Sequence, residues 1–159
     1  KEMRVKSMMN QDEIIRFIRT QKVAVVAGVD EDGFPSQKAM FAPRRIDGRT
    51  AFYFSTNTSS QKVQIFRTQP KASVYFYKQG KQKFVGIQLK GTMEVLTDHE
   101  AKASIWQPTD TMYYPLGVDD PDYCVLKFTA ACGRFYSEGK TEDFKLSDSD
   151  QSSASSDQE

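Results

Sequence analysis

The sequence has few of the residues that most catalytic and metal centres use. It contains one histidine, His99, and two cysteines, Cys124 and Cys132. This set does not make a convincing zinc or haem centre from one chain. The chain also lacks a Gly-x-Ser-x-Gly nucleophile elbow, a cysteine–histidine pair and a P-loop lysine. It therefore offers no visible metal site, and no nucleophile for hydrolysis or phosphoryl transfer.

Long apolar runs are missing as well. No stretch approaches the roughly 18 apolar residues that span a bilayer. No basic start is followed by an apolar core and a cleavage site, so we expect no secretory signal. If Cys124 and Cys132 share one strand, they lie about 26 Å apart, which is too far for a disulfide. Unpaired thiols favour a reducing compartment, so we expect a cytoplasmic protein.

The composition is that of one globular domain followed by a polar tail. The chain has 159 residues, of which 38% are hydrophobic and 12% aromatic, enough for a buried core. Residues 147–159 hold six serines, four acids and no lysine or arginine, which leaves 17 acids against 22 bases in residues 1–146. We predict a domain over residues 1–146 and a disordered tail over 147–159. The mildly basic domain suits a small anionic ligand.

Hydrophobic patterning predicts a mostly β chain with short helices. Asn10 is a candidate cap for a helix over residues 11–20, and Thr97 with Glu100 forms a capping box for a later helix that ends before Pro108. Strands are predicted at residues 22–29, 34–42, 52–54, 72–77, 84–96 and 123–136. We interpret residues 44–49 as a turn, 109–122 as a loop and 138–146 as an irregular end. Strands in hairpin order predict a small antiparallel barrel.

One stretch combines features of an anion site. The aromatic strand at 52–54 runs into hydroxyl and amide residues that end at Lys62. Thr58 and Gln61 fit a capping box, which predicts a helix beginning near Ser59. A helix N-terminus with hydroxyls and a lysine suits a phosphate. The alternative is an ordinary helix cap with a solvated lysine.

Nucleic-acid binding is a competing interpretation of the neighbouring residues. Arg44, Arg45 and Arg49 precede the aromatic strand and resemble a platform for single-stranded nucleic acid. However, alternate strand residues face opposite sides, so at least one of the three aromatic side chains belongs to the core. We therefore predict no nucleic-acid partner. A chain with so few catalytic side chains can still perform redox chemistry if a flavin supplies it.

Several segments resemble a known family. Three segments resemble the pyridoxamine 5′-phosphate oxidase-like, FMN-binding split-barrel family: Gly33–Met40, Phe54–Lys62 and Pro70–Phe76. Those that resemble its short general-stress-protein branch are Gly91–Val95, Trp106 and Tyr114–Pro121. The resemblance covers about residues 10–146. It implies a six-stranded antiparallel split β-barrel that forms a homodimer, with FMN in a groove between the subunits.

The resemblance also implies a set of cofactor-binding positions. They are Lys38, Ala39 and Met40 beside the isoalloxazine, Ser55 and Thr56 beside the ribityl chain and phosphate, Ser60, Gln61 and Lys62 at the phosphate, and Trp106. Many relatives have arginine in place of Gln61, so one phosphate contact lacks charge assistance here.

Two departures bear on the activity. The lysine with which the oxidases hold their substrate phosphate would fall near Pro43, and their C-terminal Arg-x-His segment is missing. We therefore do not expect vitamin B6 oxidase activity. The resemblance favours an FMN-dependent oxidoreductase of unknown substrate, with NADH or NADPH as a candidate electron donor and no catalytic side chain assigned. The alternatives are a non-catalytic flavin- or haem-binding stress protein and a deazaflavin-dependent reductase.

Overall fold

The structure is a computed structural model that describes residues 9–81 and 83–149. The helical elements are α1 (Gln11–Arg19), α2 (Gln61–Thr68), α3 (His99–Ile105) and the 3-10 helix η1 (Pro108–Met112). The strands are β1 (Val23–Val29), β2 (Pro35–Phe41), β3 (Arg45–Asp47), β4 (Ala51–Asn57), β5 (Lys71–Gln79), β6 (Phe84–Leu96), β7 (Tyr123–Ser137) and β8 (Lys140–Lys145).

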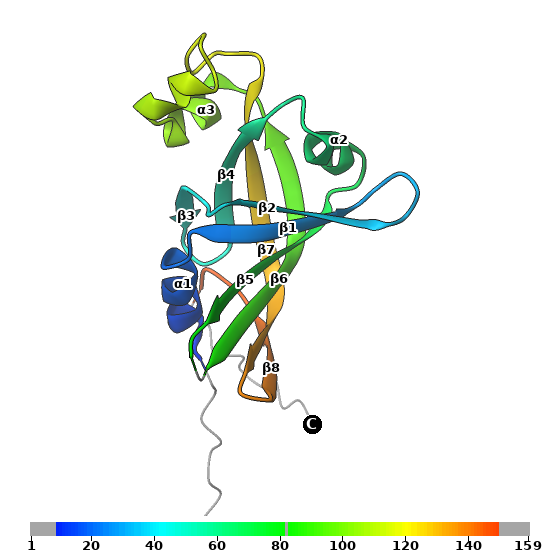
Figure 1. Ribbon diagram of the computed structural model, residues 1–159, viewed down its shortest axis with the longest axis vertical. Helices are drawn as coiled ribbons and strands as arrows, with labels where there is room; N and C mark the ends of the chain where they lie inside the picture. Colours follow the sequence, from blue (N-terminus) through cyan, green and yellow to red (C-terminus); the bar gives the residue numbers. More distant parts are fainter. Residues whose placement is uncertain (1–8, 82, 150–159) are drawn as a thin grey trace, which may run out of the picture.

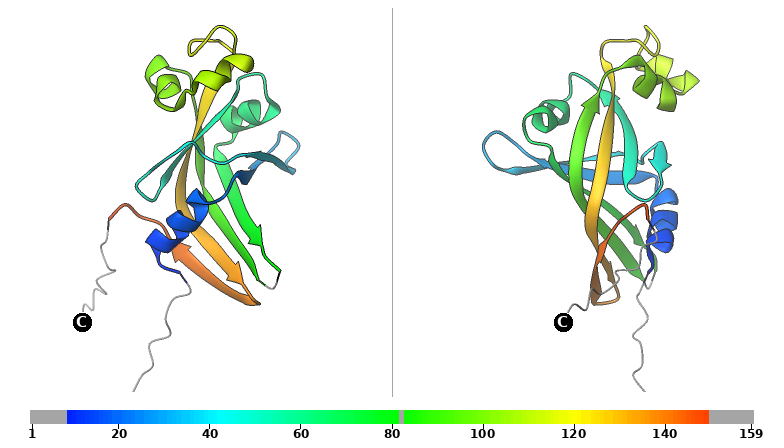
Figure 2. Two further views of the ribbon diagram at one scale, coloured as in Figure 1. Left: turned by 60° about the vertical axis from the view of Figure 1, so that its left-hand side comes forward. Right: turned by 180° about the vertical axis from the view of Figure 1, so that it is seen from behind.

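The strands form one antiparallel sheet that curls back on itself. Their order is β2-β1-β5-β6-β7-β4-β3, and β8 pairs with β7. In Figure 1, β1 and β2 cross the long strands β6 and β7. Figure 2 shows α3 and the loop after it at one end of the sheet, and α1 nearer the other end. The predicted class, a mostly β antiparallel split barrel with short helices, is confirmed.

The sequence analysis did not predict two of the strands, β3, which is short, and β8, which is polar. β3 lies in the predicted turn and contributes Ile46, which is buried and pairs with Phe52. β8 lies in the predicted irregular end, and the Arg134 guanidinium of β7 donates to the Asp143 carboxylate of β8 at 2.7 Å. Cross-strand pairing therefore makes these segments strands where intrinsic β-propensity does not.

Helix caps were predicted with mixed success. The Asn10 cap is confirmed, because its side-chain oxygen accepts from the Glu13 N–H at 2.8 Å. The Thr97 cap is wrong. The Asp98 carboxylate instead accepts from the Ala101 N–H at 3.1 Å. A carboxylate one residue further along performs the same role and moves the start of α3.

Alternation along β4 separates two packing regions. Phe52, Phe54 and Thr56 face the main core, whereas the intervening residues face the opposite side. Helices α1 and α2 pack on the main core through Ile14, Ile15, Ile18, Val63, Ile65 and Phe66. A second cluster lies beneath α3 and comprises Ile105, Tyr123 and Val125, with Tyr53, Leu96, Trp106, Tyr114 and Val118 around them. The two faces of the β4–β7 pair are therefore packed separately.

Strand β7 carries both cysteines, and the residues after β8 contact the rest of the domain. Cys124 and Cys132 both lie on β7 and are unbridged, as predicted. After β8, the Asp148 carboxylate accepts from the Arg49 N–H at 2.8 Å. Residues 150–159 of the predicted tail lie outside the described residues. Within the described part of the chain, no helix has the length and hydropathy needed to cross a membrane.

Candidate functional site

The turn that joins β4 to α2 is fixed from the loop before β7. The Thr58 N–H donates to the Asp122 carbonyl at 2.7 Å, and the Thr58 hydroxyl donates to the Pro121 carbonyl at 3.0 Å. The Ser59 N–H donates to the Asp122 carboxylate at 2.9 Å. The predicted capping box at Thr58 is therefore wrong, because its hydroxyl is already engaged. Helix α2 begins at Gln61, two residues later than predicted.

Ser60 is the N-cap residue of α2, and its hydroxyl has no partner. The side chain makes no cap hydrogen bond, and its oxygen is buried without a hydrogen-bond partner among the described residues. The first turn of α2 contains no acidic side chain. A buried unsatisfied polar group costs about 1–3 kcal/mol, and the first N–H groups of a helix have no partner within it. The Val63 N–H donates to the Ser60 carbonyl at 3.2 Å, but the Ser60 side chain caps none of the N–H groups at this helix start.

Lys62 adds positive charge to the same helix start. Its side chain is half-buried, and this burial lowers the pKa of the ammonium below its ordinary value. The positive charge of Lys38 on β2 lowers the pKa further, against a weaker opposing effect of Cys124. No carboxylate contributes to the shift. Lys62 and Lys38 are close enough for one ammonium to lower the pKa of the other, which makes this region suited to an anion, although the Asp122 carboxylate lies nearby and accepts from the Ser59 N–H.

The register of β2 determines which of its predicted residues share that region. Lys38 lies opposite Val26 and Met40 lies opposite Ala24, and both partners are buried. Paired strand residues point to the same face, so Lys38 and Met40 face the side covered by α2. Ala39 lies between them and its side chain faces the other way. Only its backbone is positioned for a contact on the α2 side.

The remaining predicted residues divide between faces. Thr56 is buried beside Cys124, its register partner, on the main-core face. Ser55 pairs with Val125 on the opposite face. Gln61 is exposed and lines a small hollow with the acidic turn at residues 30–32. The structure thus gathers Lys38, Met40, Thr56, Ser60 and Lys62 on the α2 side, but not the side chains of Ser55 and Gln61.

Trp106 belongs to the second cluster. Its ring centroid lies 5.1 Å from that of Tyr123 and 6.4 Å from that of Tyr114. The Tyr123 hydroxyl donates to the Lys102 carbonyl at 2.8 Å, and burial raises the pKa of that phenol to about 12. Within one chain Trp106 therefore lies on the face away from Lys62. Its assignment to the cofactor site remains a prediction that needs a second copy of the chain.

An ion pair that the sequence analysis did not predict binds the backbone of the residues on either side of Trp106. The Arg44 guanidinium donates twice to the Asp110 carboxylate and also donates to the Ile105 carbonyl at 3.1 Å. Asp110 accepts in addition from the Gln107 N–H at 2.9 Å. Burial acts to raise the pKa of Asp110, but the bonds from Arg44 and Gln107 outweigh it and lower the pKa. Because 66 residues separate the two partners, no local pattern indicates the pair.

Comparisons with known proteins agree with this architecture. Pyridoxine/pyridoxamine 5′-phosphate oxidases from two strains of Caulobacter vibrioides are 37% identical over 78 residues, which is 49% of this chain and 33% of theirs. The match thus spans about a third of the length of these curated relatives. A heme binding protein from Mycobacterium smegmatis has 16% identity and a TM-score of 0.68, with 88% of this chain and 60% of that chain covered.

Structures of general stress proteins match over nearly their whole length. A protein related to general stress protein 26, from Clostridium acetobutylicum, has 36% identity and a TM-score of 0.75, covering 87% of this chain and 97% of that one. General stress protein 26 from Bacillus anthracis has 20% identity and a TM-score of 0.66, covering 86% and 98%. The model of the family described as pyridoxamine 5′-phosphate oxidase matches residues 11–137. The expected resemblance is confirmed, and the chain belongs to the pyridoxamine 5′-phosphate oxidase family.

Proposed function

We propose that this chain binds FMN and acts as a flavin-dependent oxidoreductase. The observation that carries the proposal is the buried, unpartnered hydroxyl of Ser60 at the start of α2, beside the half-buried ammonium of Lys62. A phosphate monoester supplies the acceptor oxygens that this hydroxyl and the helix N–H groups lack. Its negative charge also balances the positive charges of Lys62 and Lys38. The donor set therefore fits a flavin phosphate.

The other residues of the α2 side have roles that follow from their positions. The ammonium groups of Lys38 and Lys62 balance the charge of the phosphate, and the Thr56 hydroxyl adds a hydrogen-bond donor on the same face. Met40 offers an apolar surface to the flavin ring, and the backbone of Ala39 offers hydrogen-bonding groups to the ring edge. The bound flavin supplies the hydride or electron transfer. Ser55, Gln61 and Trp106 remain proposed contacts, and Trp106 acts on the cofactor held by a second copy.

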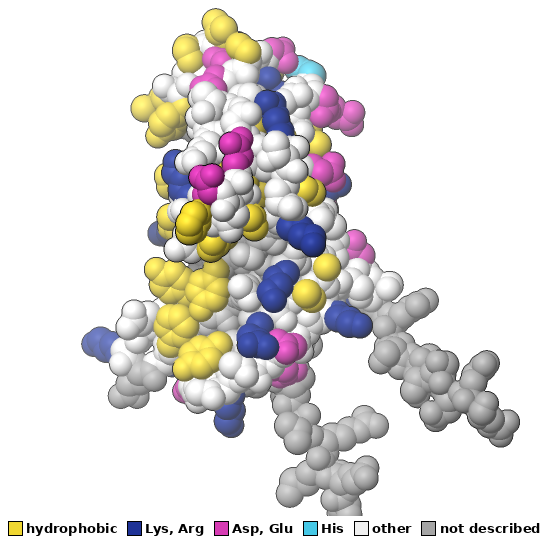
Figure 3. Space-filling model, turned by 90° about the vertical axis from the view of Figure 1, so that its right-hand side faces the viewer, with side chains coloured by type: hydrophobic (Ala, Val, Ile, Leu, Met, Phe, Trp, Pro, Cys, Tyr) yellow, Lys and Arg dark blue, Asp and Glu magenta, His cyan; other side chains and the backbone are white. Residues whose placement is uncertain are grey.

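We further propose a homodimer with the flavin between the subunits. Large apolar side chains are exposed on the sheet face turned away from the core. Phe41 is 85% exposed, Tyr77 51% and Val23 50%. Figure 3 shows hydrophobic side chains gathered on one face beside lysine and arginine side chains. Such patches mark association surfaces. Light scattering tests this proposal: we expect twice the 18.1 kDa chain mass for the wild type and a monomer for Phe41→Glu. A monomeric wild type contradicts it.

The Ser60→Ala variant tests the phosphate site because it moves two measurements in opposite directions. Without FMN, removing an unsatisfied hydroxyl should raise the free energy of unfolding by about 1 kcal/mol. With FMN, the variant should lose a hydrogen bond and bind the flavin more weakly by fluorescence titration. If stability falls and flavin affinity is unchanged, the hydroxyl has an internal partner and the site is misassigned.

Lys62→Ala tests the charge contribution, with Lys78→Ala as the matched control. Lys78 is an exposed lysine of β5 outside the site. A charge-assisted hydrogen bond contributes about 1.5–3 kcal/mol, so Lys62→Ala should raise the dissociation constant for FMN at least about tenfold. Lys78→Ala should leave it unchanged. Equal effects of the two variants would mean that only the overall charge matters.

The absorption spectrum of the purified protein separates the candidate cofactors. An FMN spectrum supports the proposal, whereas a deazaflavin or haem spectrum replaces it. The fold match to a heme binding protein makes haem worth testing. Anaerobic reduction of the bound flavin by NADH or NADPH, followed by transfer to an acceptor, distinguishes an oxidoreductase from a non-catalytic flavin carrier. The free thiols support a reducing, cytoplasmic compartment.

A further inference from the structure

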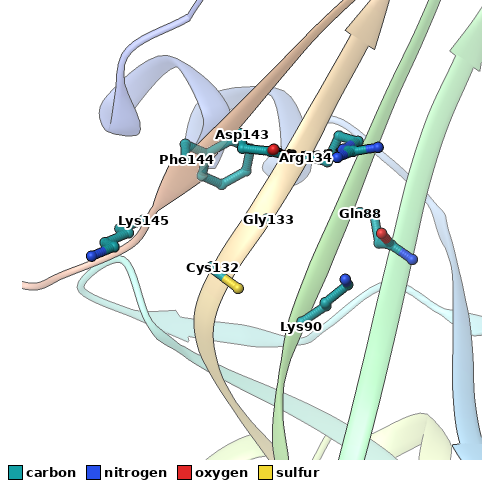
Figure 4. A pocket seen from close by; sticks show the side chains of 8 residues that line it. All are labelled: Gln88, Lys90, Cys132, Gly133, Arg134, Asp143, Phe144 and Lys145. Carbon is teal, nitrogen blue, oxygen red and sulfur yellow. Dashed lines mark hydrogen bonds and ion pairs between the residues drawn. The ribbon is translucent and has the colours of Figure 1, made fainter.

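Within one chain, a pocket of about 490 Å³ lies apart from the residues of the proposed flavin site, on the outer face of β6, β7 and β8 (Figure 4). Its size falls within the range of small-molecule pockets, which is about 300–1,000 Å³. The polar and charged side chains that line it are those of Gln88, Lys90, Cys132, Arg134, Asp143 and Lys145. None of them was assigned to a site from the sequence.

The pairing of three adjacent strands places these side chains in two rows. In the first row Cys132 lies opposite Lys90 on one side and Lys145 on the other. In the second row Arg134 lies opposite Gln88 and Asp143. Directly opposite residues have Cβ atoms about 4.5–5.5 Å apart. In Figure 4 the side chains of Lys90 and Cys132 lie next to each other, so the pocket floor has a lysine beside a thiol.

The charges of the pocket do not balance. The Asp143 carboxylate is engaged by Arg134, through bonds of 2.7 Å and 3.2 Å. Across residues 9–81 and 83–149, no carboxylate lies within ion-pair distance of Lys90 or Lys145. Three cations and one carboxylate leave a net charge of +2. A ligand that neutralises this pocket is a dianion.

The backbone keeps this arrangement in place. Gly133 pairs with Phe144, and a Cβ at Gly133 would lie 2.5 Å from the Phe144 ring. The absence of a side chain therefore lets β8 lie close along β7, which holds Lys145 opposite Cys132. A register shift between Lys90 and Gly91 marks a bulge beside the pocket. Bulges increase the local twist of a strand and redirect its side chains.

We infer that this pocket is a second ligand site, which binds a small organic dianion such as a phosphate monoester or a dicarboxylate. The inference rests on the pocket, the two cross-strand rows and the unbalanced charge, and it does not require the flavin proposal. Three cations are too few for a nucleic-acid track. A small ligand is the occupant that its size and charge favour.

Cys132 provides a reporter inside the pocket. It is partly exposed, whereas Cys124 is fully buried, so alkylation by neutral iodoacetamide reports on Cys132. The probes are glycerol 3-phosphate and succinate, with glycerol and sodium chloride of matched ionic strength as controls. We expect either or both dianions to slow alkylation several-fold in a saturable manner, and the controls to leave it unchanged. The dianion that saturates at the lower concentration identifies the preferred anionic group.

Variants connect the protection to the pocket. The double substitution Lys90→Gln with Lys145→Gln should raise the concentration needed for protection at least about tenfold, since tenfold corresponds to about 1.4 kcal/mol. Lys140→Gln, on the same strand but outside the pocket, should not change it, and neither should Lys62→Ala. Each variant is compared with and without probe, so that altered thiol reactivity cancels. The inference is overturned if neither dianion protects, if chloride or glycerol protects equally, or if the double variant behaves as wild type.

Discussion

The Arg44–Asp110 pair gives a prediction that can be worked out from the structure. Asp110→Ala removes a carboxylate that accepts two bonds from Arg44 and one from the Gln107 N–H. Breaking a fully buried pair costs about 3–5 kcal/mol. The side chain of Asp110 is 5% exposed, but that of Arg44 is 21% exposed, so water partly compensates the guanidinium. We therefore expect a loss of about 2–4 kcal/mol.

Urea unfolding measures this loss. With a urea m-value of about 2 kcal/mol per molar, Asp110→Ala should lower the unfolding midpoint by about 1–2 M. Asp110→Asn keeps one acceptor and should lose about half as much. Trp106 is the single tryptophan, and Arg44 and Asp110 contact the residues on either side of it. Its emission should therefore change in the folded Asp110→Ala protein. A midpoint within 0.2 M of wild type (about 0.4 kcal/mol) with unchanged emission would refute the reasoning.

The same pair predicts a pH dependence. The pKa of Asp110 in the folded protein is lowered from the ordinary value of 3.8. The unfolded state then binds the proton more readily, so the stabilisation is fully present above pH 3.8 and is lost as the pH falls through the lower folded value. The acid-induced loss of stability should be smaller in Asp110→Ala than in wild type. Parallel pH profiles of the two proteins would contradict this assignment.

Three further predictions concern other parts of the fold. Gly28→Ala should destabilise the protein by about 1–3 kcal/mol, because a Cβ there lies 2.8 Å from the Phe66 ring, while Gly80→Ala should be tolerated; denaturant titration compares them. Asn10→Ala should cost about 1 kcal/mol through loss of the α1 cap, and a thermal melt that matches wild type would show that the cap contributes nothing. The Tyr123 phenol, with its pKa raised to about 12, should stay neutral at pH 10, so Tyr123→Phe should leave the ultraviolet titration of the other tyrosines unchanged there.

The main strands could be predicted because their sequences carry the required signal. In β5, Val74 and Phe76 alternate with Ser73, Tyr75 and Tyr77, and this pattern predicts both the strand and its buried face. β8 could not be predicted, because its charged sequence is a strand only through Arg134 and Gly133 on β7. Helix starts were displaced because neighbouring polar residues compete for one cap, and the winner depends on partners distant in sequence.

The candidate site was predicted in part for a similar reason. Ser60 and Lys62 lie close in sequence at a helix start, so capping chemistry alone indicated an anion site there. Ser55 and Thr56 are adjacent on one strand, and adjacent strand residues direct their side chains to opposite faces of the sheet. That rule was available from the sequence and argues against grouping the two side chains. The position of Trp106 required the contacts of α3 and η1.

The division of the β4–β7 pair into two faces has a consequence for cofactor retention. One protomer carries the proposed phosphate-binding residues on the side of α2 and its single indole on the opposite face. If the proposed dimer is correct, holding the flavin and covering it are tasks of different polypeptides. Dilution that separates the protomers should then release the flavin. The apparent affinity for flavin should therefore decrease as the protein is diluted, because dimer formation and flavin binding are one coupled equilibrium.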